Sequence, residues 1–530
     1  MKYNILKKEW VLLAIFGISI MAVLFSSTRG FPGNPTVEDL NTIQWRADGP
    51  LELSPERGRF ALMYSVVEDK SLQFSLPLAR FVTPDLGINP KGEYVSLFAP
   101  GVSFLAIPGY VIGRYLGASQ VGAFATSALF ALMNLFLIYA IVKRLGGNAV
   151  TGLLGGMVFV FATPAFAYAT TLYQHHISTF ILLLSIYTLI RWNNFWSLAL
   201  IWFLFALSVV VDNPNLFFML PVSIVALGRI VWIESDVKNV AVRIRLLRIL
   251  TFFGMVLPIL FFLWFNQTSH GNPLKLSGTL PKVAAIDVNG NPTQSELAQS
   301  LNLGEQKPER EKTAVNFFRT RNLLSGFFIH FMSPDRGIIS FTPVILLGIW
   351  GLVLVCRQYA KWGALLIAII LTNVLLYSMW GDPWGGWAFG SRYLIPAYAL
   401  LSIGIGVLLH QWRKSILVSL VFFVLFFGSV AINTLGALTS NANPPQVEVL
   451  GIERLSGHEE KYTFMRNWQY LQTSGSKSFM YQAWAHRYVS PVEYYSILVG
   501  IIVIAGEILL LYATKKSTSK INPRANDQKI

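Results

Sequence analysis

The sequence predicts an all-α polytopic membrane protein with about 12 transmembrane helices and long extracytoplasmic loops. Hydrophobic residues make up 54% of its 530 residues, charged residues make up 13%, and the mean hydropathy is +0.52. Soluble globular proteins carry about 25% charged residues, so the composition excludes an ordinary soluble protein. It is also too apolar for an intrinsically disordered chain. A single cysteine, Cys356, excludes a disulfide framework and a cysteine-based zinc site.

Twelve apolar stretches approach the length of about 20 residues that crosses a bilayer. Their ranges are 10–27, 119–142, 149–170, 176–191, 197–211, 214–233, 249–266, 338–356, 362–380, 393–410, 415–435 and 494–513. A thirteenth stretch, 97–117, is interrupted by prolines and glycines. We expect it to lie against the outer membrane surface or to re-enter the membrane there. An even number of spans places both termini on the same side.

The net charge of +15 indicates which side that is. With a cytoplasmic N-terminus, the inner segments hold 20 of the 42 lysines and arginines and only four acids, whereas the outer segments hold 22 basic and 22 acidic residues. Lysine and arginine are enriched in cytoplasmic loops, so we predict cytoplasmic termini in a multi-pass protein of the cell membrane. The charge then reflects orientation and contact with anionic lipid headgroups, and we expect no nucleic acid partner.

The first span also fits a cleaved signal peptide, but no good small-x-small site follows it, which favours an uncleaved anchor. We divide the chain into a transmembrane module that carries the candidate catalytic residues, an outer loop or small subdomain, a last transmembrane helix and a basic cytoplasmic tail. These parts cover 1–435 (with outer loops 28–96 and 267–337), 436–493, 494–513 and 514–530. Loops of about 60 to 70 residues exceed ordinary connections and are usually functional. Any soluble chemistry therefore faces outward.

The first outer loop contains the best candidate for a general base. Asp48 lies in an Ala-Asp-Gly sequence, and Glu56 lies just before an amphipathic stretch that runs from Arg59 to Val67. Partial burial at the membrane surface raises the pKa of a carboxylate toward neutrality, where it can accept a proton. The alternative is that Glu56 only stabilises the start of a helix through the helix dipole.

Further along the chain, three segments could contact a substrate. Tyr94 leads from a glycine turn into the interrupted apolar stretch, and such a segment shapes a groove for an isoprenoid or is an interfacial re-entry only. His175 and His176 lie at the outer end of a span, where one of them could bind a phosphate or neither has a role. Adjacent histidines on a helix point in different directions, which argues against a shared metal ion.

The third segment, 380–394, concentrates tryptophans and glycines in a short outer loop that ends at Arg392. Tryptophan faces suit sugar stacking, and arginine binds phosphate with two parallel hydrogen bonds. A related turn places Arg336 near the same surface. The alternative is an aromatic girdle with an arginine that extends to the interface.

At these residues the sequence resembles the polytopic glycosyltransferases of the GT-C class, which use polyprenyl-phosphate sugars. The likeness is to the branch that contains protein mannosyltransferases and lipid A aminoarabinose transferases. It rests on the order and common membrane face of residues 56–62, 65–68, 94–101, 333–337, 384–387 and 390–393. Where family members usually show an aspartate–glutamate pair, this chain has Glu56 and Arg57.

The resemblance implies a GT-C-like fold and transfer of a hexose or pentose, with inversion, from polyprenyl phosphate to an extracytoplasmic acceptor that is a lipid, a glycan or a protein. A carboxylate of the first outer loop takes the acceptor proton, and we assign this role to Glu56, with Asp48 as the alternative. The donor phosphate is assigned to Arg392, His175, His176 and Arg336. Contacts to sugar or acceptor are assigned to Arg59, Tyr94, Asp382, Trp384 and Trp387.

The expected partners are the polyprenyl-phosphate sugar and membrane lipids, and no oligomeric state is indicated. We expect no cofactor and no required metal ion, because the outer acids form no obvious ligand spacing. A transporter or flippase and a non-catalytic envelope scaffold remain the competing interpretations. Transporters tend to show internal repeats and charges at mid-membrane. Here only Glu507 lies deep in a predicted span, while the long loops are all outside.

Overall fold

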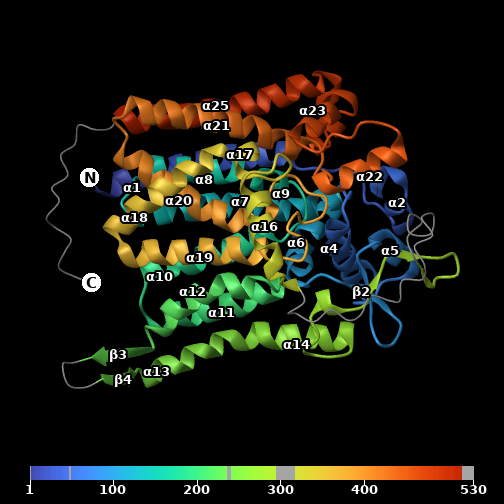
Figure 1. Ribbon diagram of the computed structural model, residues 1–530, viewed down its shortest axis with the longest axis horizontal. Helices are drawn as coiled ribbons and strands as arrows, with labels where there is room; N and C mark the ends of the chain where they lie inside the picture. The colour runs from blue at the N-terminus through green and yellow to red at the C-terminus, as the bar shows by residue number, and fades with distance from the viewer. Residues whose placement is uncertain (1, 47–48, 236–239, 294–316, 516–530) are drawn as a thin grey trace.

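The computed structural model describes residues 2–46, 49–235, 240–293 and 317–515. Its main body is a bundle of apolar helices that run along a common direction (Figure 1). These helices are α1 (Lys2–Ser27), α7 (Ser119–Arg144), α8 (Ala149–Phe161), α10 (His175–Arg191), α11 (Phe195–Val211), α12 (Asn215–Leu227), α14 (Val256–His270), α18 (Leu347–Gln358), α19 (Ala360–Ser378), α20 (Ile395–Gln411), α21 (Ile416–Leu438) and α25 (Pro491–Lys515).

Each of the twelve predicted spans coincides with one of these helices. Among the described residues, six helical segments are long and apolar enough to cross a membrane, and six shorter apolar helices account for the other predicted spans. The chain is therefore a helical, multi-pass membrane protein. The exact number of twelve spans stays a prediction.

Helix α20 occupies the centre of the bundle, and every residue from Ile395 to Leu409 is buried. It packs most closely against α18, where Gly351 faces Gly404 backbone to backbone. A Cβ at Gly351 would lie 1.9 Å from the Gly404 carbonyl oxygen, so no larger residue fits this crossing. Small residues that let helix backbones approach are a common basis of packing in membranes.

Helix α14 lies at the rim of the bundle instead. Its apolar side chains point outward, with Leu257 69%, Leu260 58% and Trp264 50% exposed. A bilayer would cover such a surface, which no soluble protein of this size would leave open to water.

Residues at one end of the bundle form a layer that we call the loop end (right in Figure 1). Its short helices are α2 (Val37–Leu40), α3 (Ile43–Arg46), α4 (Ser54–Tyr64), α5 (Leu76–Val82), α9 (Ala165–Ala169), α16 (Leu323–Phe331), α17 (Ile338–Phe341), α22 (Gln446–Ser456), α23 (Phe464–Thr473) and α24 (Phe479–Ala483). Antiparallel pairing of β1 (Leu86–Ile88) with both β2 (Tyr94–Ser96) and β5 (Lys282–Val283) joins the first and second outer loops in one small sheet. A second strand pair is formed by β6 (Ala285–Ile286) and β7 (Pro292–Thr293).

The interrupted stretch 97–117 forms a single helix, α6 (Gly101–Tyr115), which packs against α7. A Cβ at Gly109 would lie 2.3 Å from the Gly122 carbonyl oxygen of α7, so the glycines serve a close helix contact. Whether α6 lies in an interface stays a prediction.

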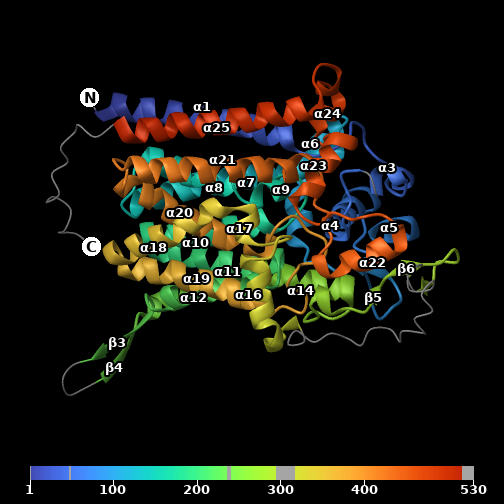
Figure 2. The same cartoon turned by 45° about the horizontal axis from the view of Figure 1, so that its top comes forward.

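At the opposite end, α1 begins and α25 ends near each other (Figure 2). Here β3 (Val231–Ser235) and β4 (Val240–Ile244) form a hairpin that projects from the bundle and leads through the short α13 (Leu246–Ile249) toward α14. The expected span 214–233 is thus shorter than predicted, because α12 ends at Leu227 and a strand begins four residues later.

Candidate active site

The first outer loop carries Glu56 into the interior of the loop end. Pro55 occupies the first turn of α4, a position that suits proline because the amide there has no helical partner. Glu56 follows in the same turn and is 0% exposed. Both of its carboxylate oxygens are buried without a hydrogen-bond partner. Neither oxygen therefore forms a capping hydrogen bond, and the alternative interaction with the helix dipole rests on the position of Glu56 in the first turn alone.

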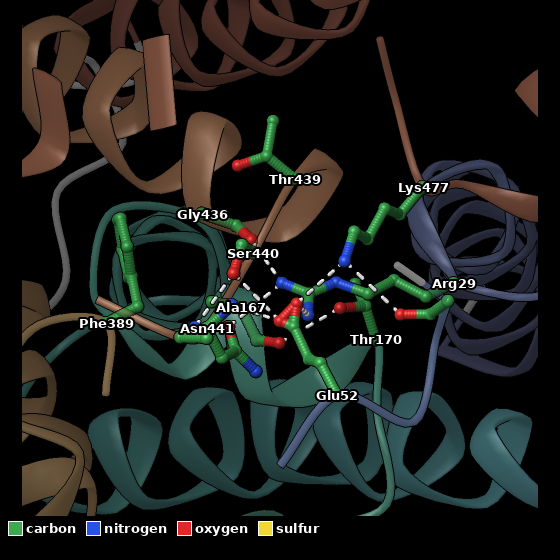
Figure 3. A network of polar contacts seen from close by, with 12 residues as sticks. Arg29, Glu52, Ala167, Thr170, Phe389, Gly436, Thr439, Ser440, Asn441 and Lys477 are labelled. Carbon is green, nitrogen blue, oxygen red and sulfur yellow. Dashed lines mark hydrogen bonds and ion pairs between the residues drawn. The ribbon is translucent and has the colours of Figure 1, made fainter. Parts of the chain in front are cut away.

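A second carboxylate, Glu52, acts electrostatically on Glu56. Glu52 is held in a network of polar contacts (Figure 3). Lys477 Nζ lies 3.0 Å and Arg29 Nη1 3.8 Å from Glu52 Oε1. The other oxygen, Oε2, accepts hydrogen bonds from Ser440 Oγ at 2.8 Å and from the Asn441 amide at 3.2 Å. Burial raises the pKa of Glu52, but Lys477 and Arg29 outweigh it and hold the pKa below its usual value.

The pKa values of the two carboxyl groups therefore shift in opposite directions. Burial, followed by the charge of Glu52, raises the pKa of Glu56 to about 8, and Arg29, Lys477 and Tyr173 oppose this only in part. Pairs of titratable groups whose environments separate their pKa values are typical of acid–base sites. Glu52 is a fixed charge, and Glu56 is a group that can exchange a proton near neutral pH.

Tyr173 interacts electrostatically with Glu56 and lies near two arginines. Its buried hydroxyl has no hydrogen-bond partner, and burial, then Glu56, raise its pKa well above the ordinary value. Arg59 Cζ lies 5.7 Å and Arg392 Cζ 5.4 Å from the centre of its ring. The tyrosine ring thus lies within reach of both guanidinium groups.

Both arginines keep donor groups free inside the protein. Arg59 uses Nη1 to donate to the Pro55 carbonyl at 2.9 Å, and Arg392 uses Nη2 to donate to the Gly385 carbonyl at 2.6 Å. Arg59 Nε and the Nε and Nη1 of Arg392 are buried without a partner. Unsatisfied buried donors are costly and call for an acceptor, and charged donors suit an anionic one.

Two more residues of this cluster come from the start of α10 and from the position directly after α11. His175 stacks on Tyr173 with ring centres 5.7 Å apart, and its buried Nε2 has no partner. Asp212 lies in the electrostatic reach of Arg59 and Arg392, and burial raises its pKa to about 6 against the effect of these arginines. Gln174 Nε2 donates to Asp212 Oδ2 at 3.3 Å. We call Glu56, Arg59, Tyr173, His175, Asp212 and Arg392 the central cluster.

The structure places the other predicted phosphate ligands outside the central cluster. His176 has its Nε2 2.7 Å from the Ala165 carbonyl oxygen, and its ring packs edge to face on Phe159. Arg336 donates to the carbonyls of Asp335, Trp384, Gly386 and Asn443, which occupy its guanidinium. These contacts with backbone oxygens stabilise the fold, and the assignment of His176 and Arg336 to the donor phosphate stays a prediction.

Asp382 shapes the loop that carries Arg392. It accepts the amides of Trp384 at 3.1 Å and Gly386 at 2.5 Å, and Gly385 and Gly386 adopt positive φ angles of 74° and 63°. Asp382 therefore stabilises the turn, and its assigned contact with sugar or acceptor stays a prediction. Trp384 lies half-buried in the same loop.

Tyr94 and Trp387 also lie apart from the central cluster. The Tyr94 hydroxyl donates to the Gly290 carbonyl at 2.8 Å, which ties β2 to the second outer loop. Trp387 Nε1 donates to Glu448 at 2.8 Å, and Arg466 lies over its ring. Asp48 lies outside the described residues, so its alternative role as the base stays a prediction. The expectation that no metal is required stays a prediction as well.

Three residues near the site, Glu52, Tyr173 and Asp212, are not among those that the sequence predicts. Glu52 is one of several acids in the first outer loop, and no local pattern distinguishes it or Tyr173. Asp212 has a recognisable signal, since it is an acid at the junction of two apolar stretches where a charge has to be accommodated.

No protein-family model and no curated protein matches the sequence. Among solved structures, the chain is similar to ArnT from Cupriavidus metallidurans bound to undecaprenyl phosphate, at 10% identity and a TM-score of 0.47, over 96% of this chain and 77% of that one. The apo state of the same ArnT gives 11% identity and a TM-score of 0.43 over the same shares. The archaeal oligosaccharyltransferase AglB from Archaeoglobus fulgidus, in complex with an inhibitory peptide and a dolichol-phosphate, gives 13% identity and a TM-score of 0.35 over 99% of this chain and 61% of that one. TM-scores this low do not indicate a function, so the evidence for function comes from the side chains of the central cluster.

Proposed function

We propose that this protein is a membrane glycosyltransferase of the GT-C type, which transfers a hexose or pentose from a polyprenyl-phosphate donor to a hydroxyl group of an acceptor. One observation carries the proposal: a buried carboxylate without partners, Glu56, lies in the same cluster as two arginines whose buried donor nitrogens are also free. A proton acceptor and an anion site side by side are what transfer from a sugar phosphate requires. The motif resemblance in the first outer loop and around Arg392 agrees with this function.

In the proposed reaction, the Glu56 carboxylate takes the proton of the acceptor hydroxyl. The acceptor oxygen forms a bond to the anomeric carbon from the face opposite the phosphate, while the bond between that carbon and the phosphate oxygen breaks. The electron pair leaves with polyprenyl phosphate, and inversion follows from attack at the opposite face. Arg59 and Arg392 stabilise the charge that develops on the leaving phosphate, as preorganised donors in a site without water do most strongly.

The positive charge of the predicted inner segments supports a location of this site on the extracytoplasmic side of the cell membrane. Nucleotide sugars are scarce there, whereas a lipid-linked donor is delivered through the membrane. The apolar helices around the central cluster suit the polyprenyl chain.

The proposal is tested with the full chain in lipid nanodiscs, supplied with synthetic polyprenyl-phosphate sugars and with envelope glycans, lipids and peptides as acceptors. We expect a new glycosidic bond by mass spectrometry and an inverted anomeric configuration by NMR. A flippase would instead move the donor between leaflets without forming a bond. Donor movement without any product, or no turnover with any donor, would contradict the proposal.

A further inference from the structure

A cavity of about 500 Å³ opens at the loop end, beside the central cluster. Helix α23 forms one wall, the turn after α21 forms another, and Trp387 and the segment before α4 complete it. Its volume falls within the range of about 300–1,000 Å³ that is typical of small-molecule sites. None of the contacts described for the central cluster uses this space.

The lining of this cavity is polar and electrically balanced. Three acids (Glu52, Glu459, Glu460) face three bases (Lys461, Arg466, Lys477), and the only aliphatic residues in the lining are Leu53 and Ala442. Two aliphatic side chains offer little surface for an acyl chain, and the balanced charges favour no strongly anionic or cationic ligand. A neutral molecule with many hydroxyl groups fits it best.

The aromatic rings of the lining, Trp387 and Tyr470, already form cation–π contacts with basic side chains. Arg466 Cζ lies 5.6 Å from the centre of a Trp387 ring, and Lys477 Nζ lies 5.1 Å from that of Tyr470. Arg466 is itself paired with Glu460, and Lys477 with Glu52. These pairs fix the walls and leave Gln469, which is exposed, to meet a ligand through hydrogen bonds.

No residue of the central cluster lines the cavity, but Glu52, which acts electrostatically on Glu56, does. Glu52 lines the cavity although its side chain is only 3% exposed, so it forms the buried floor. Lys477, which also lines the cavity, pairs with Glu52 (Figure 3) and acts electrostatically on Glu56 as well. A ligand in the cavity therefore lies next to residues that act on the proposed base.

We infer that this cavity binds a neutral carbohydrate as the acceptor of the reaction, an inference that rests on the proposed function. The hydroxyl to be glycosylated points toward Glu52 and Glu56, and the rest of the glycan lies along α23. A peptide acceptor or a lipid headgroup would need an apolar or a singly charged surface, which this lining does not offer.

The test compares two equivalent substitutions on α23. Gln469 and Gln472 are both exposed, but only Gln469 lines the cavity. Gln469→Trp fills the cavity without touching the core, and Gln472→Trp is its matched control. Binding of neutral tetrasaccharides (cellotetraose, maltotetraose and mannotetraose) to the full chain in nanodiscs is measured by calorimetry, alongside the acceptor KM in the transfer assay.

We expect at least one of these tetrasaccharides to bind the wild type, and Gln469→Trp to weaken that binding by about tenfold or more while Gln472→Trp leaves it unchanged. The KM for the donor should stay the same in both variants. Tetrasaccharide binding that is lost in Gln469→Trp supports the site even if no transfer is found, in which case the proposed function fails alone. Transfer to peptides or lipids without tetrasaccharide binding, or equal behaviour of the two variants, overturns the inference and leaves the proposed function standing.

Discussion

Glu52 and Glu56 lie in one buried region, yet their pKa values move in opposite directions. The difference arises from their partners, because Glu52 has Lys477, Arg29 and two hydrogen-bond donors, whereas the Glu56 oxygens have no partner. The two carboxylates interact electrostatically, so they do not ionise independently. The higher pKa belongs to Glu56, because burial and the charge of Glu52 both raise it.

The first prediction concerns the pH dependence of transfer. A base acts when it is ionised, so kcat/KM should rise with pH and level off above about 8, the pKa of Glu56. Glu52→Gln removes the negative charge that raises this pKa, while Arg29, Lys477 and Tyr173 still lower it, so the rise should move to lower pH. The measurement is the pH–rate profile of the two proteins, with Glu38→Gln on the exposed α2 as control. A profile that does not move, or moves to higher pH, would show that Glu52 does not act on the base.

The second prediction concerns stability. The pKa of Glu56 is about 8 in the folded state against 4.5 for the ordinary group, so folding is penalised increasingly as pH rises from 4.5 to 8. Glu56→Gln removes this penalty. Its thermal midpoint should therefore exceed that of the wild type by more at pH 8 than at pH 4, as measured by scanning fluorimetry in detergent. An equal difference at both pH values would contradict the burial of an ionisable group at this position.

At the scale of elements, the first outer loop illustrates how far the sequence leads. Its pattern predicts an amphipathic stretch from Arg59 to Val67, but α4 begins at Ser54 and buries nearly all of its residues, Glu56, Arg57 and Arg59 among them. An amphipathic pattern assumes that charged residues face water. Here Arg57 donates to the Thr83 carbonyl and Arg59 to the Pro55 carbonyl. Just before the helix, Glu52 accepts from Lys477, and a contact between residues more than 400 positions apart cannot be inferred from local spacing.

The third prediction concerns the loop that presents Arg392. A Cβ at Gly385 would lie 3.1 Å from the Tyr393 ring and 3.3 Å from Arg392 Nε, in a left-handed conformation of φ +74°. Gly385→Ala should displace the arginine and raise the donor KM, in the same direction as Arg392→Ala but less strongly. The matched control is Gly457→Ala, which has a similar φ of +71° but no atom within 4 Å of the added Cβ. If both glycine variants change the donor KM equally, general strain rather than the position of Arg392 is responsible.

At the scale of the whole molecule, composition and hydropathy predict most of the architecture. Each of the twelve predicted spans coincides with an apolar helix, because a span is a local property of about 20 residues. The β3–β4 hairpin was missed because Val231 and Trp232 continue the apolar run of α12. The candidate site was predicted in part, through Glu56, Arg59, Arg392 and His175. Its missing members, Glu52, Tyr173 and Asp212, matter only through contacts that the folded chain creates.

The fourth prediction concerns orientation. The positive charge of the predicted inner segments predicts that the hairpin lies in the cytoplasm and the loop end outside. In a Cys356→Ser background, a cysteine replacing Lys91 should react with a membrane-impermeant maleimide in intact cells. One replacing Arg243 should react only after permeabilisation. The reverse pattern would invert the topology and place the central cluster in the cytoplasm.

The most direct test of the account is the rate of sugar transfer by Glu56→Gln under single-turnover conditions. Glutamine keeps the shape of the side chain and cannot accept the proton. We predict a loss of at least about a hundredfold relative to the wild type, the usual contribution of a general base, with donor binding retained. A rate within about threefold of the wild type, in a variant that folds and binds donor, would exclude Glu56 as the base.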